Sequence, residues 1–193
     1  MTSDLPVEPS ADKVLSMHPK KFAVWLFIIS ITMIFAAMTS AYIVKQAEGN
    51  WLIFDMPTAF LYTSIVIILS SVTMQWAYFA ASRDNLGQVK WMMALTVVLS
   101  LVFLVGQYYS WVELVDSDVF FVGNPAGSFV YVFTGLHAFH LISGIVFLII
   151  VLSSAMKYKV HSRSMVQIEM CATYWHFLGG LWLYLYLFLI LNN

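Results

Sequence analysis

Five long runs without a charged residue dominate this sequence. Residues 22–44, 56–81, 91–112, 119–156 and 170–193 contain no Asp, Glu, Lys or Arg. Each run is longer than the roughly 20 apolar residues that an α-helix needs to cross a hydrocarbon core about 30 Å thick. A soluble chain of 193 residues could not bury every face of five such helices. The sequence therefore predicts an all-α, polytopic membrane protein built as a bundle of five transmembrane helices.

The composition agrees with this prediction, because 61% of the residues are hydrophobic and only 10% are charged, against roughly 25% charged in soluble domains. We expect one membrane domain over residues 1–193, in which a polar leader, 1–21, precedes the helices. The helices are expected at about 22–44, 58–81, 90–112, 129–155 and 169–191. The leader and the length of the first run are unlike a cleaved signal peptide, so we expect the first helix to be retained.

The placement of basic residues predicts the orientation of the helices. If the helices alternate in direction, eight of the nine Lys and Arg residues fall on one side: Lys13, Lys20, Lys21, Arg83, Lys90, Lys157, Lys159 and Arg163. The other side has only Lys45. Because Lys and Arg near helix ends stay on the cytoplasmic side, we expect a cytoplasmic N-terminus, a cytoplasmic leader and a C-terminus outside.

Ionisable residues inside a membrane are costly and are functional candidates by default. His137 and His140 are three residues apart and share one face of the fourth predicted span. Glu169 and His176 are seven residues apart, two turns along one face of the fifth. If these two spans pack antiparallel, the histidines lie at similar depths. The single cysteine, Cys171, excludes an intramolecular disulfide and any CxxC motif.

These residues allow three interpretations. A metal site needs three or four ligands at short range, and a b-type haem needs two histidines that face a shared cavity. The third interpretation, which we favour, is an interhelical polar cluster that fixes packing or holds a phospholipid. Its members are His137, His140, Glu169, Trp175 and His176. Three membrane histidines are too few for the catalytic core of a haem–copper enzyme, and a net charge of −1 argues against nucleic acid.

Five segments, in order along the chain, resemble subunit III of the haem–copper respiratory oxidases. TGLHAFHLISG (134–144) is similar to that family's GxHxxHV…G signature, and EMCATYWHF (169–177) with LWL (181–183) is similar to E…YWHFxDxxW. Upstream, WLFIIS (25–30) with SAY (40–42), SSVTMQWA (70–77) and GQYYSW (106–111) resemble WLFxxSE…FxxxYxA, SSxTxxWA and GxQxxEW. Together the segments are distributed over nearly the whole chain, from residue 25 to residue 183.

The resemblance implies a short, five-helix bacterial subunit III in the cytoplasmic membrane. Such a subunit is not catalytic, binds no metal, docks on subunit I, holds phospholipid and supports stable, proton-coupled oxygen reduction. Haem and copper are then expected in the partner subunits I and II, with a subunit IV or a respiratory supercomplex as further partners. Ile31, Ser110 and Gly179 stand where the family pattern has carboxylates, which argues against direct proton conduction.

Two alternatives remain open. One is an accessory subunit, similar to subunit III, of a nitric oxide reductase. The other is a small haem-binding or quinone-reactive membrane enzyme that uses His137, His140 and His176 directly. The partner chains and the haem content per chain separate these alternatives. The electron donor of the parent enzyme, cytochrome c or quinol, is encoded in its other subunits.

Overall fold

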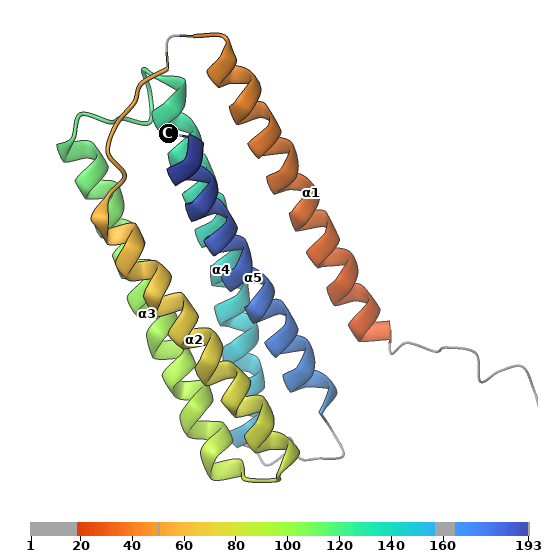
Figure 1. The fold of residues 1–193 in the computed structure, drawn as a ribbon. Helices are drawn as coiled ribbons and strands as arrows, with labels where there is room; N and C mark the ends of the chain where they lie inside the picture. The colour runs from red at the N-terminus through yellow and green to blue at the C-terminus, as the bar shows by residue number, and fades with distance from the viewer. Residues whose placement is uncertain (1–18, 50, 157–164, 193) are drawn as a thin grey trace, which may run out of the picture.

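The computed structural model describes residues 19–49, 51–156 and 165–192. All regular structure within them is α-helical, and each of the five helices is long and apolar enough to cross a membrane. The helices are α1 (Pro19–Ala47), α2 (Thr58–Ser82), α3 (Leu86–Asp116), α4 (Pro125–Met156) and α5 (Val166–Asn192) (Figure 1). The predicted all-α bundle of five membrane-spanning helices is therefore confirmed.

Residues that favour helix ends lie at the helix boundaries. α1 and α4 begin with Pro19 and Pro125, where the missing proline N–H costs nothing because the first N–H groups of a helix have no partner within it. Asn85 Oδ1 accepts a backbone N–H of the first turn of α3 at 3.2 Å. Glu113 of α3 accepts the N–H of Thr58, the first residue of α2, at 3.2 Å. A carboxylate is stabilised there by the positive end of the helix dipole.

Four of the helices form a ring in which α2 contacts α3 and α5, α3 contacts α4, and α4 contacts α5. α1 lies outside the ring and contacts only α4 and α5 (Figure 1). One stripe of α1 is buried against the ring: Ile28, Ile31, Phe35, Thr39 and Tyr42. The spacing of three or four residues keeps this stripe on one face, and large apolar side chains cover the rest of α1.

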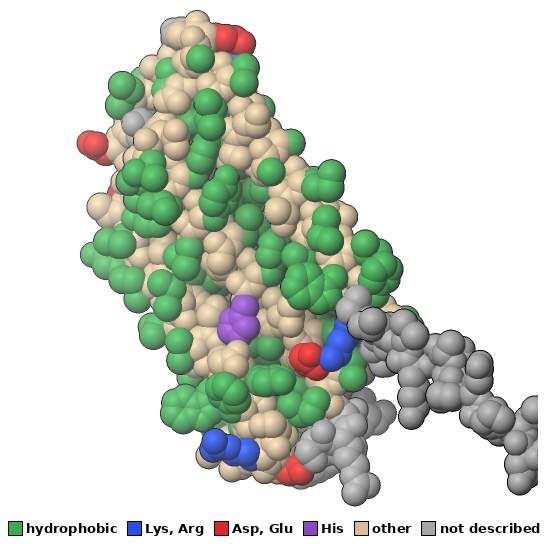
Figure 2. Space-filling view, turned by 45° about the vertical axis from the view of Figure 1, so that its right-hand side comes forward, with side chains coloured by type: hydrophobic (Ala, Val, Ile, Leu, Met, Phe, Trp, Pro, Cys, Tyr) green, Lys and Arg blue, Asp and Glu red, His purple; other side chains and the backbone are tan. Residues whose placement is uncertain are grey.

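The outer surface of the bundle is apolar between two polar ends. Many large hydrophobic side chains are exposed along the helices, including Met33 of α1, Val72 of α2 and Leu191 of α5. In Figure 2 the charged side chains of the face shown lie towards its ends, with hydrophobic side chains between them. Such a surface is suited to lipid and not to water.

The helices extend beyond the predicted spans. α3, for example, covers Leu86–Asp116 where 90–112 was expected. A charged residue marks the limit of the hydrocarbon core, whereas a helix continues through the interface into water. Of the leader, only Pro19, Lys20 and Lys21 lie within the described residues, and the basic residues Lys13, Lys157, Lys159 and Arg163 lie outside them.

Candidate functional site

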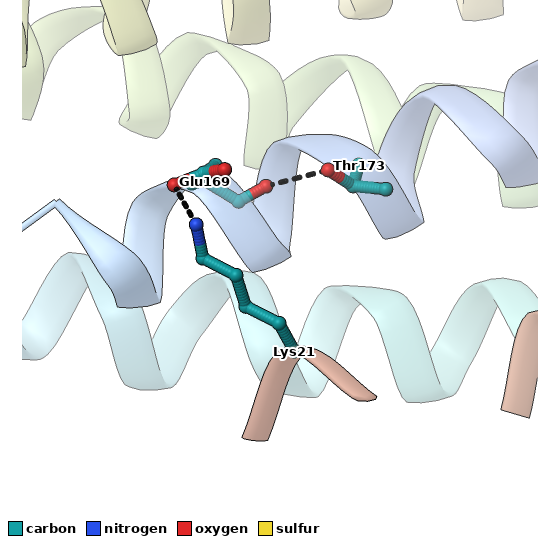
Figure 3. A network of polar contacts seen from close by, with 3 residues as sticks. All are labelled: Lys21, Glu169 and Thr173. Atoms are coloured by element: carbon teal, nitrogen blue, oxygen red, sulfur yellow. Dashed lines mark hydrogen bonds and ion pairs between the residues drawn. The ribbon is translucent and has the colours of Figure 1, made fainter. Parts of the chain in front are cut away.

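Glu169, in the first turn of α5, forms an ion pair with Lys21, in the first turn of α1. Lys21 Nζ lies 2.7 Å from Glu169 Oε2, and the two side chains are 31% and 40% exposed (Figure 3). The backbone oxygen of Glu169 also accepts the hydroxyl of Thr173 at 2.9 Å. The pair therefore joins α1 to α5 at the end of the bundle where α1 begins.

His176, two turns further along α5, contacts α2 instead of α1. Its Nε2 and Oε1 of Gln75 are 2.9 Å apart. Because an amide oxygen only accepts, the histidine N–H donates, which leaves Nδ1 of a neutral ring as an acceptor. Both side chains line a groove of about 380 Å³ between α2 and α5, whose other walls include Gly179 and Gly180.

Three indole groups each donate to a hydroxyl on a neighbouring helix. Trp175 and Trp182 of α5 donate to Ser70 and Ser64 of α2, at 2.8 and 2.9 Å. Trp111 of α3 donates to Thr134 of α4 at 2.9 Å. Interhelical hydrogen bonds of this kind contribute about 0.6 kcal/mol each on average in membrane proteins, so their main effect is to fix which faces of the helices meet.

His140 lies at the contact between α4 and α1. Its Nδ1 donates to the backbone oxygen of Leu136, one turn earlier in α4, at 2.8 Å. Its ring contacts Phe27 and Phe35 of α1 at centroid distances of 6.4 and 5.9 Å. His140 is 7% exposed and packs as an aromatic residue between the ring of four helices and α1.

His137 lies one turn earlier, in the centre of the ring of four helices. It is fully buried, and its ring lies 5.2 Å from Trp182 of α5 and 6.0 Å from Phe103 of α3, between centroids. Neither ring nitrogen has a hydrogen-bond partner among the residues that the structure describes. His137 and His140 thus face different neighbours, although they are only three residues apart.

The five predicted site residues have separate partners. Glu169 bonds to α1, whereas Trp175 and His176 bond to α2. The two histidines of α4, His137 and His140, form no hydrogen bond with Glu169, Trp175 or His176. No hydrogen bond joins two of the three described histidines. Within 19–49, 51–156 and 165–192, no three His, Cys, Asp or Glu side chains form a group that could hold a metal ion.

The partners of these residues were not predicted from the sequence. Gln75 and Gln107 are amides inside apolar runs. Because a polar group in hydrocarbon needs a partner, their position could have identified them as members of interhelical hydrogen bonds. Ser64, Ser70 and Thr134 gave no such signal. A hydroxyl in a helix can bond to a backbone oxygen of its own preceding turn, as Ser64 and Thr134 also do.

The three positions that depart from the family pattern are buried or tightly packed. Ile31 is 1% exposed in the contact of α1 with the ring. Ser110 is fully buried and donates to the backbone oxygen of Gly106 at 3.0 Å. A Cβ on Gly179 would lie 3.0 Å from Oγ of Ser71, so a larger residue there requires the Ser71 side chain to shift.

The comparisons with known proteins agree with this architecture. A family model described as cytochrome c oxidase subunit III matches residues 11–192. The chain belongs to the cytochrome c oxidase subunit III family. A cytochrome c oxidase subunit 3 of Corynebacterium diphtheriae is 31% identical over an aligned length of 170 residues, and the match covers 84% of this chain and 82% of the relative. One from Synechocystis sp. is 30% identical over an aligned length of 183 residues, and the match covers 90% of this chain and 77% of the relative.

Members of the family differ in length. The cytochrome c oxidase subunit 3 of Pelomedusa subrufa is 33% identical over 134 residues, which are 69% of this chain but only 49% of that relative. The chain therefore spans about half the length of that protein. The resemblance inferred from the five sequence segments is confirmed by these matches.

Proposed function

We propose that this chain is the non-catalytic subunit III of a bacterial haem–copper terminal oxidase. In this proposal it lies in the cytoplasmic membrane with its N-terminus inside, packs on subunit I, and stabilises an enzyme that reduces oxygen and pumps protons. Subunits I and II hold the haem and copper. The family match over residues 11–192 carries the proposal, and the bacterial relatives of similar length support the bacterial setting.

The surroundings of the membrane histidines support a structural role over a catalytic one. His137 is enclosed between aromatic rings of α3 and α5, and His140 between α4 and α1. Two axial ligands of one haem must face a shared cavity. His176 instead faces α2, where it bonds to Gln75. The family's carboxylate positions, which would be needed for proton conduction, are filled by Ile31, Ser110 and Gly179.

An apolar groove at the outer end of α1 and α4 supports the phospholipid part of the proposal. It has a volume of about 810 Å³ and apolar walls that include Val44 and Phe129. Lys45, which forms an ion pair with Glu48, lies on its lining near the connections between helices, as do Glu48, Asn124 and Ser128. An acyl chain in the groove would place a polar headgroup beside these side chains.

The proposal is tested by purifying the tagged chain from its native membrane in mild detergent. We expect an oxidase spectrum in the complex, oxidase subunits I and II by mass spectrometry, and no haem absorbance once the chain is separated from them. Lipid mass spectrometry of the same sample is expected to find phospholipid that stays with the chain through detergent exchange.

Different results would overturn separate parts of the proposal. Haem absorbance that stays with the isolated chain would make it a haem protein. Co-purification with the catalytic chain of a nitric oxide reductase would change the parent enzyme. If the chain lost all phospholipid and stayed folded, only the proposal that it holds phospholipid would be overturned.

A further inference from the structure

Two polar side chains inside the ring of four helices have unpaired atoms. Gln107 of α3 is 1% exposed; its Nε2 donates to Oγ1 of Thr63 at 3.1 Å, but its Oε1 has no partner in the described part of the chain. Both ring nitrogens of His137 on α4 also lack a hydrogen-bond partner among the described residues. Buried polar atoms are nearly always hydrogen-bonded, to protein or to ordered water.

The register of α3 and α4 places these two side chains at one level. The helices run antiparallel (Figure 1), and the Trp111–Thr134 hydrogen bond fixes one point where they meet. Gln107 is four residues along α3 from that bond, and His137 is three residues along α4 in the same direction across the membrane. At 1.5 Å per residue these steps are about 6 and 4.5 Å, so the two levels differ by only about 1.5 Å.

The faces of the helices agree with this register. Phe103, Gln107 and Trp111 are spaced by four residues and share one face of α3. Trp111 meets Thr134 on one side of Gln107, and Phe103 contacts the ring of His137 on the other. Gln107 is therefore bracketed by two contacts to the face of α4 that carries His137.

The chemistry of the unpaired atoms selects the ligand. Gln107 Oε1 only accepts, while a neutral imidazole offers one N–H donor and one acceptor nitrogen. A water molecule can donate to the amide oxygen and bond to either ring nitrogen at the same time. Ordered buried waters occupy such positions between otherwise unpaired groups.

We propose that one ordered water molecule bridges Oε1 of Gln107 and a ring nitrogen of His137 in the core of the bundle. The bridge extends the bonds from Phe60 O and Thr63 on α2 through Gln107 on α3 to His137 on α4. It gives Gln107 and His137, which lie in the sequence segments 106–111 and 134–144, one common role as the two protein ligands of the water. The proposal does not depend on which enzyme the chain serves.

A high-resolution electron microscopy map of the purified complex tests the bridge directly. The expected result is a density peak within hydrogen-bond distance of both Gln107 Oε1 and one ring nitrogen of His137. A direct hydrogen bond between the two side chains, or continuous apolar packing between them, would overturn the proposal.

Thermal unfolding of the full-length chain in lipid nanodiscs gives an independent test. In the wild-type background, His137→Leu is expected to lower the unfolding midpoint by about 2–4 °C, because the water loses a partner. In a Gln107→Met background, which has already lost the bridge, the same change is expected to leave the midpoint unchanged or raise it. The control is Ser100→Ala, at a buried serine that bonds to Val97 of its own helix; its effect should be the same in both backgrounds.

The sign of the His137→Leu effect decides between a bridged and an unpaired histidine. If the ring were simply unpaired, replacing it with an apolar side chain would raise the midpoint in wild type. An equal effect of His137→Leu in both backgrounds would show that His137 and Gln107 are not coupled, and would also overturn the bridge.

Discussion

Gly106 of α3 packs directly against Thr63 of α2, and the absence of a side chain on Gly106 permits this contact. A Cβ at this position would overlap the methyl group of Thr63. Thr63 cannot easily rotate, because its hydroxyl donates to Phe60 O and accepts from Gln107, and because a β-branched side chain has few χ1 rotamers. We therefore expect Gly106→Ala to destabilise the protein by about 1–3 kcal/mol, measured by thermal unfolding in detergent.

Gly180 of α5 provides the matched control for this substitution. A Cβ there meets nothing within 4 Å, and alanine is favoured over glycine inside a helix by about 0.5–1 kcal/mol. Gly180→Ala should therefore leave the unfolding midpoint of the isolated chain unchanged or raise it slightly. Equal destabilisation by the two variants would contradict the steric explanation for Gly106.

For individual residues, the sequence predicted which side chains are site candidates better than it predicted which residues they contact. Glu169 and His176 were identified because ionisable residues within a predicted span are costly and are functional candidates. They were assigned to one face, seven residues apart, yet one bonds to Lys21 and the other to Gln75. α5 lies between α1 and α2, so a small rotation along its length is enough to change the partner. Which helices are neighbours is a tertiary property that residue spacing does not contain.

Among the elements, α1 depends most on a few polar contacts, because it packs only on α4 and α5. At its N-terminal end Lys21 pairs with Glu169. At its C-terminal end Tyr42 and Gln46 donate to the backbone oxygen of Asn192, at 3.1 and 2.7 Å. Between these ends the contact is one buried stripe, which is apolar except for Thr39, whose hydroxyl accepts from Tyr184 of α5 at 3.3 Å. α1 is therefore the helix whose position is most sensitive to changes at its ends.

The ion pair is predicted to hold the first turns of α1 against α5. Because both side chains are partly exposed, the pair contributes no more than about 1 kcal/mol, and its loss should act locally. We expect Lys21→Met to increase hydrogen–deuterium exchange in the first two turns of α1, with exchange in α2 to α5 unchanged. The double exchange Lys21→Glu with Glu169→Lys should restore protection. Exchange that is unchanged in Lys21→Met would show that the apolar stripe alone positions this end of α1.

The five helices themselves could be predicted because charge-free length is a direct requirement of the bilayer. Their ends could not be predicted as well. α3 begins four residues before the predicted span, with Asn85 as its cap, and ends at Asp116 beyond Glu113. Polar residues remain helical in the interface, where water, caps and neighbouring helices satisfy the terminal backbone groups.

In the molecule as a whole, successive helices alternate in direction, and this places most of the described basic residues at one end of the bundle. Lys20, Lys21, Arg83 and Lys90 belong to the end of the bundle where α1 begins, and Lys45 belongs to the other end. This arrangement is consistent with the orientation proposed from charge, in which the first end is cytoplasmic. The internal contacts of the bundle are the same in either direction across a membrane, so the orientation is measured by labelling from one side.

Cysteine labelling in intact cells or sealed spheroplasts decides the orientation. The chain has one cysteine, Cys171, which is buried and can be replaced by serine to give a background without thiols. Ser82 and Ser117 form a matched pair, because both are exposed, both lie at the C-terminal ends of helices, and they lie at opposite ends of the bundle. With a membrane-impermeant maleimide, we expect Ser117→Cys to react from outside and Ser82→Cys to react only after the membrane is opened. The reverse pattern would place the N-terminus outside, and would mean that Lys and Arg near the helix ends do not set the direction of this bundle.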